Sequence, residues 1–140
     1  MNTKKILLGS FAGAVTYFLL GWLIYGMLLM DYMTNSCPNI PGLNRNESEM
    51  LLWVMFISNL LSAFLMAYIF DLAKISGWMN GMKQGAIIGF IITAAFDTGM
   101  YAMTFMLTKN WLMIDVLAST VMAAIVGAVV AAVMGMSDKN

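Results

Sequence analysis

The sequence predicts an all-α protein, an integral membrane bundle of four transmembrane helices with the N and C termini cytoplasmic. Three observations predict this fold: an apolar composition, four long apolar segments and an uneven distribution of Lys and Arg. The chain is 61% hydrophobic and 10% charged, and its mean hydropathy is +0.84. A soluble domain is about half apolar and about a quarter charged. The composition therefore excludes a water-soluble fold, and also a disordered chain, which needs the opposite balance.

Each of the four apolar segments reaches the length of roughly 20 residues that a membrane crossing requires. They lie at about residues 6–30, 50–70, 86–107 and 111–135 of a single domain, 1–140. The connection Thr108–Asn110 is so short that the third and fourth segments should form an antiparallel hairpin. The connection Asp31–Glu49 is expected to be ordered by turns, and Asp71–Gln84 to hold a short interfacial helix.

The orientation follows from counting Lys and Arg on each side, because cytoplasmic loops carry more of them. One side has five of these residues, namely Lys4, Lys5, Lys74, Lys83 and Lys139, and the other has two, Arg45 and Lys109. Lys4 and Lys5 resemble the basic start of a signal peptide, and Ala12–Ala14 resembles its cleavage site. The apolar run before that site, Ile6–Phe11, is too short for such a leader, and it continues sixteen residues beyond Ala14. We therefore expect an uncleaved anchor.

Composition also limits the chemistry. The seven basic residues equal the seven acidic residues, so there is no basic excess for a nucleic-acid partner. The absence of histidine removes the usual general base. A single cysteine excludes an internal disulfide framework and a cysteine-rich zinc site. The sequence predicts no catalytic residue, no cofactor and no metal site, and therefore no enzyme.

Asp97 is the residue that most needs a protein partner. It lies about ten residues from each end of its predicted segment, where an ionised Asp costs on the order of 2.5–3.5 kcal/mol. Thr93 and Tyr101 lie four residues before and after it on the same helix face. Asn59 lies at the same expected depth on the second segment and is the predicted partner of Asp97. These four residues are candidates for proton or cation coupling, and the alternative is a buried hydrogen-bonded cluster that fixes the helix register.

Asp115 is predicted to have a structural role near the start of the fourth segment, where the helix dipole favours a negative charge. Asp97-Thr98-Gly99 matches the tripeptide of aspartic proteases, whose chemistry needs two carboxylates that share a proton. The predicted segment boundaries separate Asp97 and Asp115 by about 9 Å in depth. The sequence therefore predicts that the two carboxylates do not meet within one chain.

Small residues predict where the helices pack, because membrane helices associate through close backbone contact. The candidate packing glycines are Gly9 and Gly13 in the first segment, Gly85 and Gly89 in the third, and Gly127 and Gly135 in the fourth. They would serve the bundle itself, a second copy of the chain or another membrane protein.

Sixteen methionines are present, and two sets recur at three-residue spacing near the predicted outer ends of helices. The sets are Met27, Met30 and Met33, with Cys37 close by, and Met100, Met103 and Met106. Sulphur ligands suit Cu(I), whereas methionine also fills irregular gaps between helices. Because methionines occur throughout the chain, gap filling is the favoured interpretation.

Several stretches resemble a known family. They are Leu20-Gly21-Trp22-Leu23-Ile24-Tyr25-Gly26, Ala63-Phe64-Leu65-Met66-Ala67-Tyr68, Gly85-Ala86-Ile87-Ile88-Gly89-Phe90 and the small-residue fourth segment. Together they resemble a family of small bacterial four-span inner-membrane proteins of unknown function. Members of that family often have a proline shortly after the tyrosine of the first helix, where this chain has Gly26. The resemblance implies four helices and a bacterial inner membrane, and it implies no activity.

Two functions stay open at this stage. The favoured one is a non-enzymatic structural or accessory bundle that oligomerises or docks on a membrane partner, with Asp97 hydrogen-bonded inside a closed bundle. The alternative is a small proton- or cation-coupled transporter, which requires a cavity that reaches Asp97.

Overall fold

The computed structural model, which describes residues 2–43 and 45–137, confirms an all-α fold. Of these described residues 83% are helical, and four of the helices are long and apolar enough to span a membrane. The α-helices are α1 (Thr3–Leu23), α2 (Met30–Ser36), α3 (Leu52–Leu72), α4 (Trp78–Met103) and α5 (Lys109–Ser137), with a π-helix η1 (Ile24–Leu28) and a 3₁₀ turn η2 (Glu47–Glu49). Lys139, part of the predicted orientation count, lies outside the described residues.

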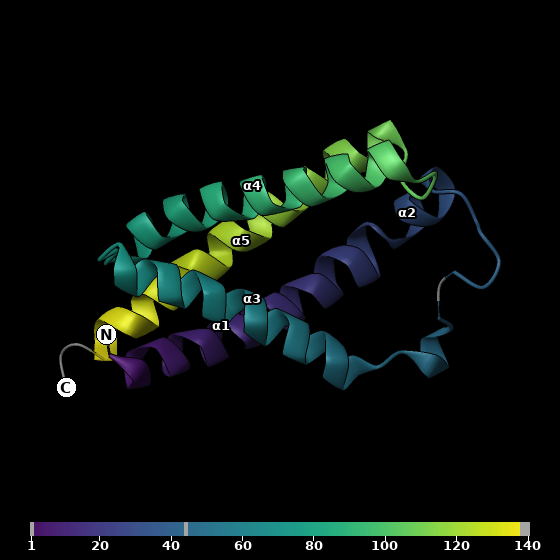
Figure 1. Ribbon diagram of the computed structural model, residues 1–140. Coiled ribbons are helices and arrows are strands. Elements are labelled where there is room, and N and C mark those ends of the chain that lie inside the picture. The colour runs from purple at the N-terminus through teal and green to yellow at the C-terminus, as the bar shows by residue number, and fades with distance from the viewer. Residues whose placement is uncertain (1, 44, 138–140) are drawn as a thin grey trace.

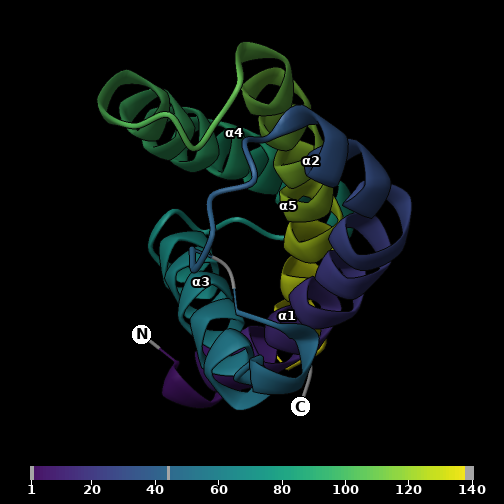
Figure 2. The same ribbon diagram turned by 90° about the vertical axis from the view of Figure 1, so that its right-hand side faces the viewer.

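The four long helices form two antiparallel pairs. The hairpin α4–α5 is one pair and α1–α3 is the other, and α1 packs on α5 to join them (Figure 1). The helices therefore follow the order α3, α1, α5, α4, and the two outer members, α3 and α4, hardly touch (Figure 2). The two ends of the chain lie at the same end of the molecule. We call this the terminal end, and the opposite end, which holds α2 and the α4–α5 connection, the loop end.

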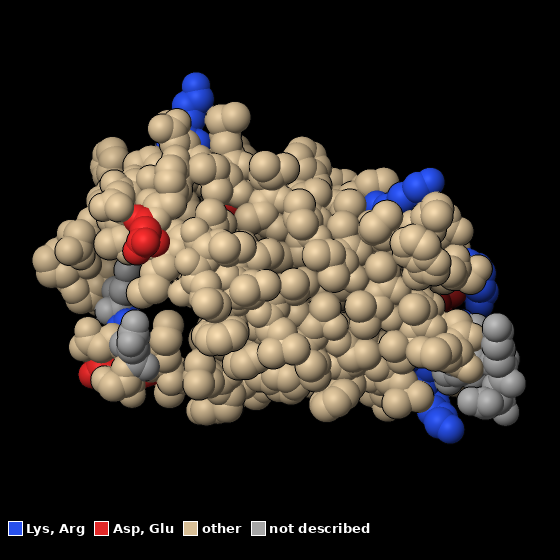
Figure 3. Space-filling model, turned by 180° about the vertical axis from the view of Figure 1, so that it is seen from behind, with Lys and Arg blue, Asp and Glu red and all other residues tan. Residues whose placement is uncertain are grey.

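The surface between these ends is apolar. Figure 3 shows Lys, Arg, Asp and Glu mainly at the two ends, with a broad and nearly uncharged band between them. Large hydrophobic side chains are exposed along this band, including Phe11, Leu61 and Phe96, which are 60%, 65% and 66% exposed. A soluble protein rarely exposes a contiguous apolar surface of this extent. Lipid tails are the solvent that this surface requires.

The buried core lies toward the terminal end, where α1, α3 and α5 meet. Its buried members are Ile6, Met66, Ala67, Phe70, Ala123, Val126, Val130, Ala131 and Met134. Phe70 is fully buried and is the largest of them. Because the core gathers at one end, the loop end must be held together by other contacts.

The bounds of α4 correct the predicted boundaries of the third segment. The helix begins at Trp78 rather than at residue 86 and ends at Met103 rather than at residue 107. It starts after Gly77, whose φ of +82° stops the preceding backbone from continuing as a helix. It ends at Thr104, which is extended. The polar residues Asn80 and Lys83 are exposed on the first turns of α4, which explains why hydropathy alone missed these turns.

The end of the first helix also differs from a simple predicted span. The α-helical pattern of α1 gives way to the π-helix η1, where the Leu29 N–H donates to the Ile24 carbonyl at 2.8 Å. A π-helical turn contains an extra residue and redirects the side chains that follow. The chain then forms α2, within the region where only turns were predicted.

Candidate functional site

Helices α4 and α5 meet along a seam of residues spaced four apart. A side-chain carbon added to Gly81 would overlap Ala131, and one added to Gly89 would overlap Ala123. The residue numbers of each facing pair sum to 212, as expected for two antiparallel helices in constant register. Four-residue spacing keeps all of these residues on one helix face. The register of the seam therefore also predicts the facing pairs in which neither residue is glycine.

The terminal half of the seam permits very close backbone contact. A Cβ atom on Gly85 would lie 2.9 Å from the Cα atom of Gly127 and would overlap the carbonyl oxygen of Ala123. Only hydrogen fits at such a distance, so these glycines are what allows α4 and α5 to pack backbone against backbone.

The other half of the seam carries polar residues in the same register. Thr93 and Ser119 form one layer, and both line the cavity described below. Asp97 and Asp115 form the next, and their carboxyl groups lie close enough for a hydrogen bond. The prediction that Asp97 and Asp115 do not meet is thus wrong. Asp97 lies six residues before the end of α4 and Asp115 six residues after the start of α5, so both are about 9 Å from the hairpin connection.

We call Asp97 and Asp115 the carboxyl pair. Asp97 is only 4% exposed, and its Oδ2 atom is buried without a hydrogen-bond partner among the described residues. An ionised carboxylate can only accept hydrogen bonds. A hydrogen bond between Asp97 and Asp115 therefore forms only when one of the two carries a proton.

Tyr25 and Ser119 connect to the carboxyl pair from η1 and α5. The Tyr25 hydroxyl donates to Asp115 Oδ1 at 2.5 Å, and it lies 2.8 Å from Ser119 Oγ. A tyrosine hydroxyl has one proton, and Tyr25 uses it on Asp115, so Ser119 donates to the Tyr25 oxygen. Tyr25 belongs to the π-helix η1, the local irregularity that brings α1 into this contact.

An aromatic cluster covers the carboxyl pair toward the loop end. Trp111, at the start of α5, is 5% exposed. Its ring meets Tyr25 edge-on at a centroid distance of 6.4 Å and stacks on Tyr32 of α2 at 6.2 Å. These geometries are favourable for aromatic pairs. The cluster ties α1, α2 and α5 together and screens Tyr25 from that side.

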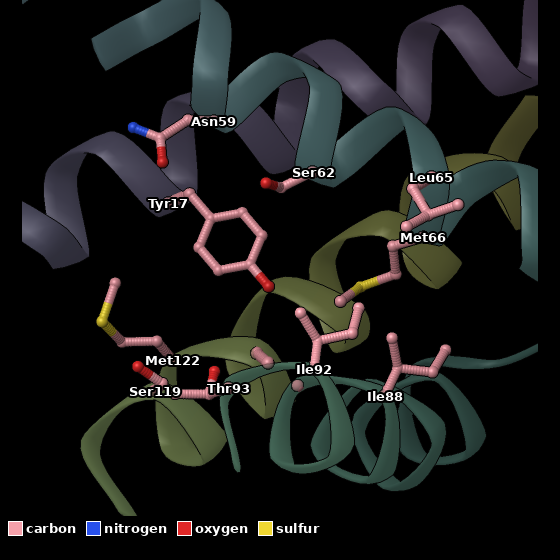
Figure 4. A pocket seen from close by; sticks show the side chains of 12 residues that line it. Tyr17, Asn59, Ser62, Leu65, Met66, Ile88, Ile92, Thr93, Ser119 and Met122 are labelled. Carbon is pink, nitrogen blue, oxygen red and sulfur yellow. The ribbon is translucent and has the colours of Figure 1, made fainter. Parts of the chain in front are cut away.

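A cavity of about 250 Å³ lies on the other side of the carboxyl pair, toward the middle of the molecule. Its lining combines hydroxyl and amide groups with aliphatic and methionine side chains from all four long helices: Tyr17, Asn59, Ser62, Leu65, Met66, Ile88, Gly89, Ile92, Thr93, Ser119, Met122 and Ala123. Figure 4 shows Asn59 and Ser62 on one side, Thr93 and Ser119 on the other, and the Tyr17 ring between them. This space is large enough for several water molecules or a small solute.

The structure separates the four candidate coupling residues into different environments. Asn59 and Thr93 line the cavity. Asp97 faces Asp115 rather than Asn59, and neither carboxyl lines this cavity. Tyr101 is 46% exposed and does not line the cavity either. An aspartic-protease arrangement would need both carboxyls to face a water-filled cleft that admits a peptide, and the burial of Asp97 does not provide one.

The remaining candidate glycines also fall into two groups. A Cβ atom on Gly9 would lie 2.8 Å from Met134 of α5. One on Gly13 would lie 2.7 Å from Val130 of α5 and 2.9 Å from Ala63 of α3. Gly135 has no neighbouring atom within 4 Å of such a position, so it does not take part in a close helix contact.

The methionine sets lie mostly on the surface. Met27, Met30 and Met103 are 60%, 44% and 78% exposed. No group of three or more His, Cys, Asp or Glu residues that could hold a metal occurs among the described residues.

Sequence reasoning missed three members of this site: the pairing role of Asp115, the hydroxyl of Tyr25 and the linking position of Ser119. The four-residue spacing common to α4 and α5 was a usable signal. Aligning the glycines of one helix with the small residues of the other would have placed Asp115 opposite Asp97. For Tyr25 no comparable signal exists, because its direction depends on the π-helix.

No protein-family model, curated protein or solved structure matches this chain. The resemblance to a bacterial four-span family, the bacterial inner membrane and the cytoplasmic termini stay predictions. The function must therefore be argued from the site itself.

Proposed function

We propose that this protein is a small proton-coupled transporter, in which the carboxyl pair binds the proton and the cavity holds the transported solute. The observation that carries the proposal is the hydrogen-bonded chain from Ser119 through Tyr25 to Asp115. It connects a residue that lines the cavity with the carboxyl pair. Ionisable groups at membrane depth are expensive, and their usual role is in ion pathways and proton relays.

The chain is arranged so that protons can move along it. Ser119 donates to Tyr25 and Tyr25 donates to Asp115, so every donor points toward the carboxyl pair. A proton that reaches Ser119 from water in the cavity can be passed on as Ser119 and Tyr25 each exchange one O–H bond for another, and Asp115 takes the proton that Tyr25 gives up. No residue on this route changes its net charge except the carboxyl that finally takes the proton.

The carboxyl pair responds to that proton as a unit. Two ionised carboxylates in contact repel each other strongly in a low-dielectric setting. Loss of the last shared proton replaces a hydrogen bond between α4 and α5 with repulsion. Protonation thereby strengthens the contact between α4 and α5. A transporter needs such a link between proton binding and the arrangement of its helices.

The accessory-bundle alternative receives less support. It requires a closed bundle in which the polar groups of Asp97 are satisfied. The poor contact between α3 and α4 and the partnerless Asp97 Oδ2 favour transport instead. Docking on a second copy or on another membrane protein is compatible with either function.

The test is proton flux into liposomes that contain the purified protein, a trapped pH-sensitive dye and sodium chloride on both sides, driven by lowering the external pH while valinomycin and K⁺ hold the membrane potential at zero. We expect the wild-type protein to acidify the lumen faster than empty liposomes. We expect Asp97→Asn and Tyr25→Phe to abolish this flux, the first by removing the proton acceptor and the second by breaking the hydroxyl chain. Asp31→Asn, an acid exposed on α2, is the matched control and should retain the flux.

Size-exclusion profiles and circular dichroism would establish that each variant is folded before flux is compared. If folded wild-type protein conducts no more protons than empty liposomes, transport is refuted and the accessory role becomes the better account. If Asp97→Asn retains full flux, the carboxyl pair is not the proton site.

A further inference from the structure

We propose that the carboxyl pair is also a cation site, at which a small monovalent cation such as Na⁺ exchanges with the shared proton. This inference rests on the proposed function, because it names the ion that the proton is exchanged for. The first observation is a buried atom without a hydrogen-bond partner. Asp97 Oδ2 is buried and has no hydrogen-bond partner among the residues described.

The ligand chemistry around that atom suits a hard cation. The Asp115 carboxyl interacts with the Asp97 carboxyl, and the Tyr25 and Ser119 hydroxyls continue the cluster of oxygens from Asp115. Hard cations prefer carboxylate and other oxygen ligands. The cluster is compact, since Tyr25 Oη lies 2.5 Å from Asp115 and 2.8 Å from Ser119. Two adjacent carboxylates form a site of strong negative field, which attracts a small ion more strongly than a larger one such as K⁺ because the small ion approaches more closely.

Charge identifies a monovalent ion. With one proton shared between its two carboxyls, the pair carries a net charge of −1. In the exchange the O–H bond of this shared proton breaks, the proton leaves to water, and Na⁺ binds between the two carboxylates, so the net charge stays at −1. A monovalent cation and a proton are therefore interchangeable without changing the charge that the membrane interior must accommodate. A divalent cation would change it.

Access to the pair fits this exchange. The aromatic cluster of Trp111, Tyr25 and Tyr32 covers the pair toward the loop end. On the opposite side Ser119 belongs both to the oxygen cluster and to the cavity wall. The cavity is thus the route by which a hydrated ion reaches the pair, and Ser119 and Thr93 are the hydroxyls that it meets first.

The experiment measures proton release from purified protein in weakly buffered detergent solution, followed with a pH indicator during addition of NaCl. We expect a saturable release approaching one proton per chain. Choline chloride at the same concentration, a cation too large for the site, should release none. LiCl should resemble NaCl and KCl should be weaker. Asp97→Asn and Asp115→Asn should release none, and Asp31→Asn should behave as the wild type.

The wild-type titration alone can refute the inference, so it does not depend on the variants folding. Equal release by NaCl and choline chloride, or no release at several pH values around neutrality, overturns it. A stronger response to MgCl₂ than to NaCl overturns the monovalent assignment.

The liposome assay distinguishes failure of the proposed cation site from failure of the proposed function. Proton flux that requires Asp97, combined with no sodium-dependent proton release, would refute the cation site and leave proton coupling intact. Sodium-dependent release without any flux would support the cation site and refute transport.

Discussion

The two halves of the α4–α5 seam share one geometry and differ in chemistry. In the terminal half, Gly85 and Gly127 face each other with no side chain between the backbones. In the loop half, the same four-residue spacing and the same register place Asp97 against Asp115. The first half gains van der Waals contact, and the second brings together two groups that repel when both are ionised. A rigid hairpin at one end thus supports a costly polar contact at the other.

This difference shows how a small membrane protein can hold two acids at close range. Membrane helices gain no hydrophobic energy from association, so close packing and hydrogen bonds must hold them together. The glycine half supplies the close packing. The acid half is then stabilised by the Tyr25 hydroxyl that donates to Asp115 and by the aromatic contacts of Trp111.

The largest effect is expected from Gly127→Ala, compared with Gly135→Ala on the same helix. The added methyl at position 127 would overlap the carbonyl oxygen of Gly81, whereas position 135 has open space. Overpacking against backbone should cost about 3 kcal/mol of unfolding free energy. At position 135 the better helix propensity of alanine should leave stability unchanged or raise it by up to about 1 kcal/mol. Chemical unfolding in detergent, followed by circular dichroism, measures both; equal stability of the two variants would contradict the seam.

A smaller effect is expected from Tyr25→Phe. The substitution keeps the ring on Trp111 and removes the hydroxyl that bonds Asp115 and Ser119. Hydrogen bonds between membrane helices contribute about 1 kcal/mol each at most sites, so we expect a loss of about that size in the same unfolding assay. Tyr68→Phe is the control, because Tyr68 is 37% exposed and its ring stacks on Phe64. A loss of equal size in both variants would argue against the Tyr25 hydrogen bonds.

The smallest effect is expected in the labelling rate of the Cys37 thiol, at the end of α2. Partial burial raises the pKa of the Cys37 thiol above its ordinary value of 9.0, and a hydrogen bond from the Thr108 backbone opposes this in part. Because only the thiolate reacts with maleimides, the folded chain should be labelled more slowly than the chain unfolded in denaturant. The raised pKa means that this difference is largest below the pKa and shrinks as the pH rises above it. Equal labelling rates at all pH values would show that Cys37 is not buried against Thr108.

The sequence was sufficient to predict the four spans, because hydropathy over roughly 20 residues is a strong signal. It was not sufficient to place the ends of α4. The exposed Asn80 and Lys83 lower the hydropathy of the first turns, and Thr104–Thr108 are apolar enough to read as helix although Thr104 is extended. A shift of about one turn at that boundary moved Asp97 to the membrane centre and away from Asp115. Because of this shift, the sequence analysis placed Asn59 rather than Asp115 opposite Asp97.

Other parts of the site could be predicted in part from the sequence. The stripe that contains Thr93 and Asp97 was evident from four-residue spacing, and so were the packing glycines Gly85 and Gly89. The cavity was not, because it depends on α3 and α4 standing apart, and spacing within one helix carries no information about that. The role of Tyr25 depends on a π-helix that no local sequence rule predicts.

Paired cysteines test the contact between Asp97 and Asp115. A disulfide forms only when the two Cα atoms lie within about 7 Å. In a Cys37→Ser background, the double variant Asp97→Cys with Asp115→Cys should form an intrachain disulfide rapidly under mild oxidation in membranes. The matched double variant Asp97→Cys with Asn59→Cys should not. Efficient cross-linking of positions 97 and 59, with none between 97 and 115, would contradict the carboxyl pair and the function built on it.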